Sequence, residues 1–371
     1  MQRPSKEDLA AQQPFMDSIL ADPDDLSNYQ VFSDWLIERG DPRGELIGLE
    51  LQLNSPNVKG DERKTLSLKV KELEDAFAHL WMPEPLVPYL CSEPEDRDAS
   101  YSFSFSKGFL ASIYFDIVPN DFLEAVANSD LRLLWDMSIG MIDYGKNEAA
   151  YETLAKGDYS NCRFLDIGRE FSPAEVNNVD KLVRKMPRLE SLDFDTRTIS
   201  GIFKIPMQHL HTMSLKAGYG YPIEELAANK SLSKLESIHI LPHADDGDAP
   251  YITLESFRKF CKADHFKNLK AISFQLTEFG NEGIECLLKA PFWPQLTSLN
   301  LSNGTVRDEG ALLLAEQDLS RFKKLDLYGN YITNVGVEAL KKRCSAASCD
   351  HQLEGEIDAE MREHLWEGCM E

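Results

Sequence analysis

One short pattern recurs along most of this chain and constrains its fold more than any other feature. Three clear copies of the form L-x-x-L-x-L begin at Leu269, Leu296 and Phe322, so the same markers return after 27 and then 26 residues. The last copy continues to Asn330 at position 9. In each copy a glycine then opens an apolar run with helical spacing. A coherent period of this length predicts a stack of similar strand-and-helix units.

The spacing inside the pattern has a physical reason. Side chains alternate along a strand, so positions 4 and 6 point to the same side, and the following helix packs there. One unit cannot bury this wedge alone, so neighbouring units must stack. We therefore expect Leu299, Leu301, Leu325 and Leu327 to be buried. We also expect Asn330 to bond backbone groups in a tight turn, because an unpaired buried group costs about 1–3 kcal/mol.

The whole array resembles the bacterial leucine-rich repeat proteins with ribonuclease-inhibitor-like repeats. Six weaker copies precede the three clear ones, and they begin at Leu110, Leu134, Cys162, Leu189, Leu210 and Leu235. The resemblance implies an α/β solenoid over residues 100–344, in which a curved parallel sheet carries its helices outside. After Leu340 the pattern is expected to stop.

The first 82 residues differ in kind from the repeats and predict a small helical module. Expected helices run from Ser5 to about Leu20, across Leu26 to Leu36, from near Gly44, and over 61–82. A set of short phrases recurs there: Asp22-Pro23, Phe32-Ser33-Asp34-Trp35-Leu36, Gly40 to Glu45, and Leu51-Gln52. Over residues 14–55 these phrases resemble the repeat-companion domain that precedes many bacterial leucine-rich repeat arrays. Trp35 and Leu36 are expected in the core, and Asp34 and Arg43 as an ion pair or cap.

The remaining segments and the composition bound what the chain binds. Residues 83–99 are proline-rich and acidic and predict a linker, and residues 345–371 predict an acidic C-terminal cap or tail. The net charge is −23, which disfavours phosphate backbones and anionic lipid and favours a protein partner with a basic surface. The odd count of seven cysteines and the absence of a signal-like start favour a cytoplasmic location. We expect no nucleic acid and no membrane partner.

The sequence carries no signature of catalysis, so we expect a protein that is not an enzyme and has no cofactor. LDFDTRT, from Leu192 to Thr198, fails the aspartate-nucleophile phosphatase pattern because Arg197 stands at its fifth position. HADDGD, from His243 to Asp248, lacks the spaced ligands of a calcium loop. Cysteines and histidines near the C-terminus do not have a common zinc spacing, so no metal is expected. We assign no catalytic residue.

The strand residues that point away from the wedge form the candidate site. They line the concave face of the predicted sheet, and the partner-binding residues we select there are Asp166, Asp193, Asp195, His239, Asn300, Asp326 and Tyr328. The three aspartates from 166 to 195 predict an acidic centre, with both members of the second strand facing solvent. This surface predicts a scaffold, adaptor or recognition module that binds another protein. An inhibitor or immunity protein for a basic nuclease toxin, and a GTPase-activating protein, are the alternatives.

Overall fold

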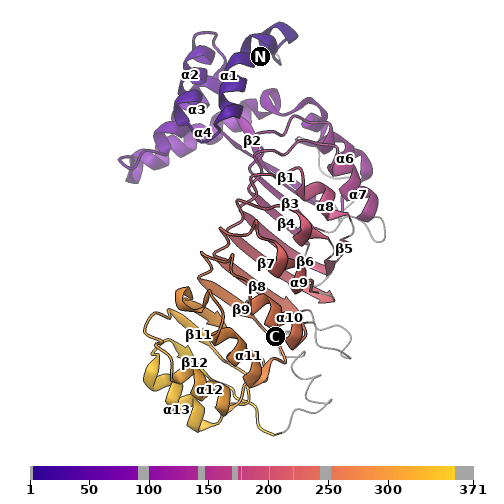
Figure 1. Cartoon of the computed structure of the whole chain (residues 1–371). Coiled ribbons are helices and arrows are strands. Elements are labelled where there is room, and N and C mark those ends of the chain that lie inside the picture. Colours follow the sequence, from indigo (N-terminus) through magenta and orange to yellow (C-terminus); the bar gives the residue numbers. More distant parts are fainter. Residues whose placement is uncertain are drawn as a thin grey trace. The chain divides into compact units, whose positions relative to one another are not determined.

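The computed structural model describes residues 3–90, 100–140, 147–168, 174–176, 178–199, 201–219, 221–242 and 252–355. The chain separates into two compact units, Met1–Leu165 (unit 1) and Asp166–Glu371 (unit 2). The boundary falls inside strand β4 (Phe164–Gly168), and each unit is described by itself (Figure 1). The domain bounds expected from the sequence, at 82, 99 and 344, stay a proposal.

Unit 1 begins with four helices, close to the predicted positions. They are α1 (Lys6–Ala21), α2 (Leu26–Ile37), α3 (Pro42–Leu53) and α4 (Gly60–Trp81). Side-chain caps fix where the first three begin. Ser5 Oγ accepts the Asp8 N–H at 3.2 Å, while Asp25 and Asp41 cap α2 and α3. These caps satisfy N–H groups that a helix leaves unpaired at its first turn.

The helices of unit 1 share a core with its first strands. Five buried side chains form this core: Ile19, Tyr29, Phe32, Leu36 and Ile47. Trp35 is half-buried and packs against them together with Phe109, the first residue of β2 (Phe109–Asp116). The rings of Phe32 and Phe109 lie 6.1 Å apart. Apolar burial therefore joins the helical module to the first repeat strand.

The expected interaction between Asp34 and Arg43 is wrong. Asp34 is exposed and accepts a hydrogen bond from Gln30, which lies one helical turn earlier on the same face of α2. Arg43 is buried and donates from Nη2 to Gln12 Oε1 at 2.5 Å. The cap on α3 is supplied by Asp41 instead.

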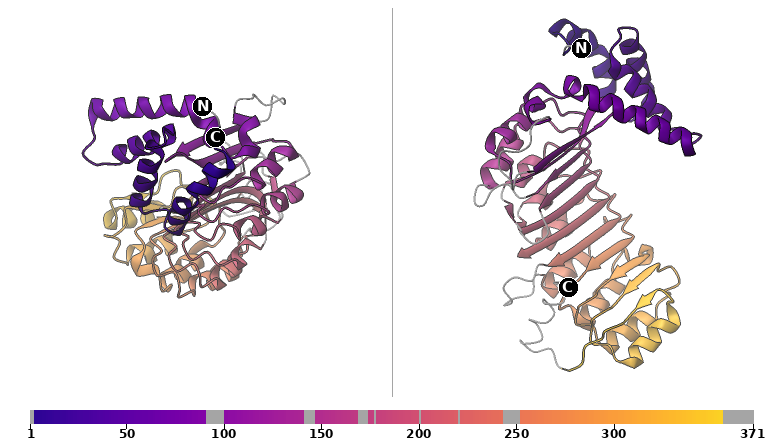
Figure 2. Two further views of the ribbon diagram at one scale, coloured as in Figure 1. Left: turned by 90° about the horizontal axis from the view of Figure 1, so that it is seen from above. Right: turned by 180° about the vertical axis from the view of Figure 1, so that it is seen from behind.

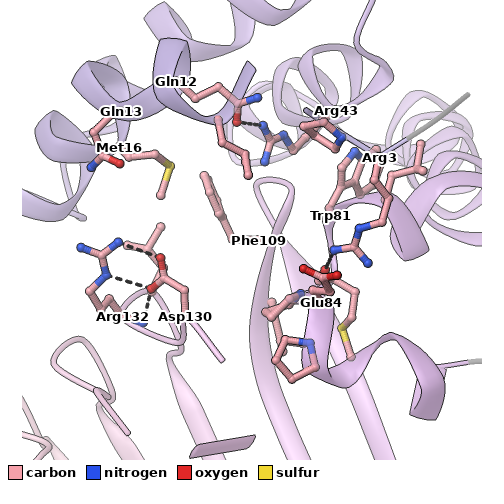
Figure 3. Close-up of a pocket in the computed structure, with 18 of the residues that line it drawn as sticks. Arg3, Gln12, Gln13, Met16, Arg43, Trp81, Glu84, Phe109, Asp130 and Arg132 are labelled. Carbon is pink, nitrogen blue, oxygen red and sulfur yellow. Dashed lines mark hydrogen bonds and ion pairs between the residues drawn. The ribbon is translucent and has the colours of Figure 1, made fainter. Parts of the chain in front are cut away.

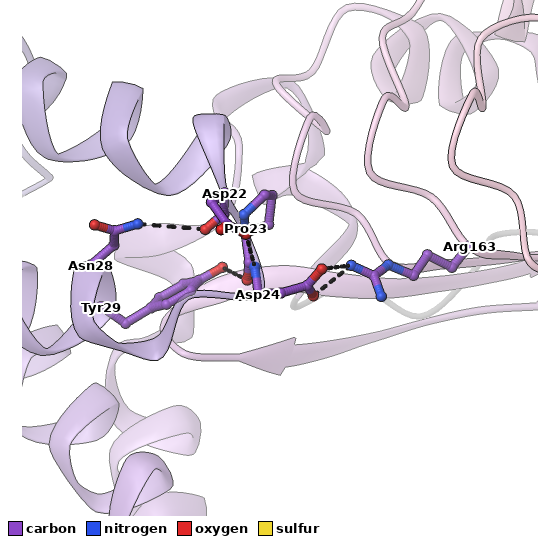
Figure 4. A network of polar contacts seen from close by, with 6 residues as sticks. All are labelled: Asp22, Pro23, Asp24, Asn28, Tyr29 and Arg163. Atoms are coloured by element: carbon purple, nitrogen blue, oxygen red, sulfur yellow. Dashed lines mark hydrogen bonds and ion pairs between the residues drawn. The ribbon is translucent and has the colours of Figure 1, made fainter. Parts of the chain in front are cut away.

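The Asp22-Pro23 phrase forms a loop that contacts the repeat strands within unit 1 (Figure 4). The Tyr29 hydroxyl donates to the Pro23 carbonyl at 3.2 Å. Both carboxylate oxygens of Asp24 accept from Arg163 Nη2, at 2.5 and 2.6 Å. The Arg163 guanidinium also stacks 4.1 Å above the Trp135 ring. The phrase therefore positions an acid that pairs with a nearly buried arginine.

A short helical segment follows α4 inside the stretch predicted as a linker. It consists of η1 (Glu84–Leu86) and α5 (Val87–Leu90). Leu86 is fully buried, and the Tyr89 ring lies 4.9 Å from that of Phe122 on α6 (Asn120–Ala127). Packing thus orders residues 84–90, while 91–99 lie outside the described residues.

The strands of unit 1 begin with a hairpin that the predicted parallel sheet did not include. Strand β1 (Ser100–Ser106) pairs antiparallel with β2, and β3 (Asp136–Ile139) pairs parallel with β2 on its other side. Lys107 and Gly108 form the hairpin turn, both with positive φ (51° and 72°), the conformation that two-residue hairpin turns of type I′ need. Helix α7 (Asn147–Leu154) follows β3.

Unit 2 is the parallel part of the array. Its strands are β5 (Ala174–Val176), β6 (Ser191–Ile199), β7 (Thr212–Tyr219), β8 (Ser237–Pro242), β9 (Ala271–Phe274), β10 (Ser298–Asn300), β11 (Lys324–Asp326) and β12 (Ala347–Ser348). The order from β6 to β12 follows the sequence, and β5 pairs with β6.

The helices of unit 2 lie together on one face of this sheet (Figures 1 and 2). They are α8 (Val179–Val183), η2 (Ile202–Lys204), α9 (Ile223–Ala228), α10 (Leu254–Cys261), α11 (Gly280–Leu288), η3 (Trp293–Gln295), α12 (Asp308–Ala315) and α13 (Asn334–Arg343). We call the opposite face of the sheet the strand face.

Burial confirms the predicted register in all nine copies of the pattern. Every residue at positions 1, 4 and 6 is at most 5% exposed, including Met137 and Cys162 in the weak copies. Leu299 and Leu325 are fully buried and pair in register on neighbouring strands. The sheet and the helices therefore enclose one continuous row of apolar side chains, as a stacked array requires.

Asn330 has the predicted role at position 9. It is fully buried, and its Nδ2 donates to the carbonyls of Leu301, Leu327 and Tyr328 at 2.8, 3.1 and 3.3 Å. Its Oδ1 accepts the Val306 N–H at 2.9 Å. One side chain thus satisfies backbone groups of two successive repeats.

The array continues beyond Leu340, where we expected it to stop. Cys344, Ala347 and Cys349 occupy positions 1, 4 and 6 of a tenth copy, and β12 pairs parallel with β11. Gln352 stands at position 9: its Nε2 donates to the Leu327 carbonyl at 2.8 Å, and its Oε1 accepts the Ile332 N–H at 2.9 Å. Residues 345–355 therefore belong to the repeats, and 356–371 lie outside the described residues.

Candidate binding face

The predicted partner-binding residues all lie in unit 2, on the strand face. The five at position 5 are Asp166, Asp193, His239, Asn300 and Asp326, and the two at position 7 are Asp195 and Tyr328. Ladder pairing places the position-5 residues from β6 to β11 directly beside one another, in the order Asp193, Ser214, His239, Ser273, Asn300, Asp326. A parallel ladder thus turns residues far apart in sequence into one continuous row.

The members of this row differ in how far they reach solvent. Asp166 and Tyr328 are exposed, and Asp193, His239 and Asp326 are half-buried. Asn300 is only 9% exposed and accepts the Ser302 N–H at 2.9 Å, so it closes a local turn. The strand face therefore offers five accessible predicted residues.

The expectation that Asp193 and Asp195 both face solvent is wrong for Asp195, which is 7% exposed. Its backbone lies against Gly168, where a Cβ atom would stand 1.7 Å from the Asp195 carbonyl oxygen. Lys216, its ladder partner on β7, brings Nζ to 3.8 Å from Asp195 Oδ2. Close backbone packing and a neighbouring lysine thus cover this carboxylate.

Lys216 also changes the electrostatics expected for the acidic centre. Burial raises the pKa of Asp193, while a hydrogen bond with Ser214 and the charge of Lys216 lower it in part. Burial lowers the pKa of His239, and the Asp193 charge opposes this shift. His239 is therefore largely neutral at neutral pH, and the centre of the row is a mixed surface of acids, one lysine and a neutral imidazole.

A polar network continues from this centre to the end of the row. Gln275 Nε2 lies 3.1 Å from His239 Nε2 and 3.3 Å from Ser273 Oγ, and Ser302 Oγ donates to Gln275 Oε1 at 3.4 Å. Because an amide nitrogen only donates, the contact with Nε2 fits an imidazole that carries its proton on Nδ1. These residues hold His239 in one orientation.

The row ends in an accessible aromatic patch. The Tyr328 side chain is 39% exposed, and its ring lies 5.1 Å from that of His351. Asp326 accepts the Tyr328 N–H at 3.1 Å, and Lys324 Nζ lies 3.5 Å from Asp326 Oδ2. Tyrosine combines apolar area with a polar tip, as interface residues often do.

Sequence reasoning missed three residues that shape this surface: Lys216, Gln275 and Lys324. All three occupy strand positions that face away from the core, so the repeat register itself was the signal. Among the residues that the structure describes, no group of three or more His, Cys, Asp and Glu side chains could hold a metal ion. Every described helix is too short or too polar to cross a membrane.

The buried repeat positions, the position-9 side chains and the one-sided helical layer define an α/β leucine-rich repeat solenoid, and the chain is a leucine-rich repeat protein. The family described as Leucine Rich repeat matches residues 294–315, within the clearest copies of the pattern.

Solved structures give the same fold. A protein from Bacteroides fragilis is 21% identical, with a TM-score of 0.50, over 63% of this chain and 70% of that chain. The internalin InlF from Listeria monocytogenes is 16% identical, with a TM-score of 0.36, over 63% of this chain and 64% of its own. InlP of the same organism is 11% identical, with a TM-score of 0.32, over 62% and 56%. No curated protein matches this sequence.

Proposed function

We propose that this chain is a non-enzymatic interaction module that binds another protein on the strand face of unit 2. The observation that carries the proposal is the in-register row from Asp193 to Asp326, which combines half-exposed polar groups with the exposed Tyr328. Side chains on a rigid ladder lose little freedom on binding, because the sheet already fixes their spacing.

The chemistry of the row supports a partner with a basic surface. Asp166, Asp193 and Asp326 present carboxylates on one face, and the chain carries a net charge of −23. Summed fields of this sign speed encounter with a positive surface. Lys216 and Lys324 add local specificity, because they repel a partner whose cations face them in the wrong register.

The acidic surface also supports the narrower function of an inhibitor of a basic protein, such as an immunity protein for a nuclease toxin. Such a protein would place its acids where the toxin's own basic substrate-binding groups lie. Partner identity separates this function from a general scaffold.

The test compares two charge reversals of equal size in affinity capture from the native cell. One variant carries Asp193→Lys and Asp326→Lys on the strand face. Its matched control carries Glu285→Lys and Glu338→Lys, which are exposed on helices α11 and α13. Asp195 stays unchanged, because its buried side chain contributes to folding.

We expect the strand-face variant to lose the partner and the helix variant to keep it, with both melting at the wild-type temperature within a few degrees. Loss of the partner in the helix variant alone would assign binding to the helical layer and refute the proposal. Salt should weaken capture by the wild type more than by the strand-face variant.

A further inference from the structure

Unit 1 contains a cavity of about 420 Å³ that the proposed function does not use. It lies among helix α1, the end of α4, the start of β2 and residues 130–133. Figure 3 shows Arg43, Arg3 and Trp81 on one side of it, the pair of Asp130 and Arg132 on the other, and Phe109 between them.

Arg43 is the unusual member of this lining. Its side chain is 7% exposed, and its guanidinium carbon lies 5.0 Å from the Phe32 ring centroid and 5.7 Å from that of Phe109. Nη2 donates to Gln12, but Nε is buried without a hydrogen-bond partner. Burial lowers the pKa of Arg43 to about 10, so the group stays charged at neutral pH. A buried charge with an unused donor is costly unless an acceptor meets it.

The other polar groups of the cavity leave donors rather than acceptors available. Trp81 Nε1 is also buried without a hydrogen-bond partner. Asp130 is occupied by Arg132, whose Nε and Nη2 donate to its two oxygens at 2.8 and 2.7 Å. Arg3 donates to the Met82 carbonyl from Nη2. A ligand that complements this lining supplies acceptors and a negative charge.

The charge balance and the apolar lining specify that ligand further. Three arginines and two carboxylates line the cavity, so it holds one net positive charge, which suits a monoanion rather than a phosphate dianion. Met16, Phe109 and Leu133 are among the apolar side chains of the lining. Carboxylates pair well with the fork of arginine donors, and the apolar wall suits a hydrocarbon body.

We propose that this cavity binds a monocarboxylate carried on an apolar body, with Arg43 Nε and Trp81 Nε1 as donors to the carboxylate. The free C-terminal residue of a peptide and a small aliphatic acid share this chemistry. The site is independent of the strand face, which lies in unit 2.

Isothermal titration of the full chain with three probes tests the proposal. The probes are acetyl-leucyl-leucine with a free carboxylate, the same dipeptide as its C-terminal amide, and octanoate. We expect at least one carboxylate to bind, and the dipeptide, if it is that one, to bind about tenfold or more tightly than its amide, since charge-assisted hydrogen bonds are about twice as strong as neutral ones. Binding by the dipeptide assigns a peptide terminus, and binding by octanoate alone assigns an aliphatic acid.

Three variants locate the binding. Arg43→Gln should abolish it, and Trp81→Phe, which keeps the aromatic packing, should weaken it severalfold. Arg39→Gln removes the same charge from an exposed arginine that stacks on Trp35 at 3.9 Å outside this cavity, and should leave binding unchanged. Circular dichroism and the melting temperature verify that each variant folds.

Several results would overturn the proposal. They are no binding of either carboxylate at about 10 mM, where even a Kd near 1 mM would saturate, equal binding of dipeptide and amide, or unchanged binding by folded Trp81→Phe and Arg43→Gln. None of these results would affect the proposal for the strand face, because that proposal rests on unit 2 and on a protein partner.

Discussion

Replacing Asn330 by alanine should disrupt the array more than any other single polar change, because one buried side chain serves four backbone groups. Two of these groups have a second partner. The Leu327 carbonyl also accepts from Gln352, and the Tyr328 carbonyl accepts the Asn303 N–H at 2.7 Å. The Leu301 carbonyl and the Val306 N–H bond only to Asn330 among the described residues.

The expected cost follows from these two groups. Each buried group left unpaired costs about 1–3 kcal/mol, so the free energy of unfolding should fall by about 2–6 kcal/mol. Asn330→Asp should cost less than alanine does, since its carboxylate still accepts the Val306 N–H while it loses the donor to Leu301.

Urea unfolding followed by circular dichroism measures this loss, and hydrogen exchange locates it at the Val306 amide. Asn334→Ala is the matched control, because Asn334 is exposed at the start of α13, where surface substitutions stay within about 0.5 kcal/mol. A loss below about 0.5 kcal/mol for Asn330→Ala, with unchanged protection of the Val306 amide, would refute the reasoning.

Three further predictions concern packing and charge. Leu325→Ala should destabilise by about 2–5 kcal/mol in urea unfolding through lost burial and a new cavity, and a loss within 0.5 kcal/mol would contradict the register. Burial raises the pKa of Glu50 from 4.5 to about 7, so the folded state binds its proton more tightly. Its contribution is complete below pH 4.5 and is lost as the pH rises through 7. Relative to Glu50→Gln, the wild type should therefore lose up to about 3 kcal/mol across that window, and parallel pH profiles would exclude the effect. Asp24→Asn should destabilise unit 1 by about 1–2 kcal/mol, because the nearly buried Arg163 loses its anion; an unchanged melting temperature would show that the pair contributes nothing.

The repeat array was predictable because its signal is periodic. Inward positions must be apolar for geometric reasons, so even Met137 and Cys162 could be placed once the period was known. The tenth copy was missed because Cys344 and Ala347 stand where leucines are usual, and Gln352 replaces asparagine with a side chain one methylene longer.

Other features could not be read from local sequence because they depend on contacts through space. The alternation in residues 100–106 predicts a strand but not its antiparallel direction, which the Lys107-Gly108 turn determines. Asp195 looked exposed because its strand position faces away from the core, but Gly168 and Lys216 on other strands cover it. Arg43 was assigned to Asp34 by proximity in sequence, whereas Gln12 on another helix contacts it.

Site-specific photocrosslinking in the native cell tests the central claim, protein binding on the strand face, most directly. Benzoylphenylalanine replaces Tyr328 on the strand face or Leu312 on helix α12, two side chains with almost equal exposure, 39% and 40%. The account predicts a protein adduct from position 328 that disappears when Asp193 and Asp326 are changed to lysine, and none from position 312. An adduct from position 312 alone, or from neither position, would contradict it.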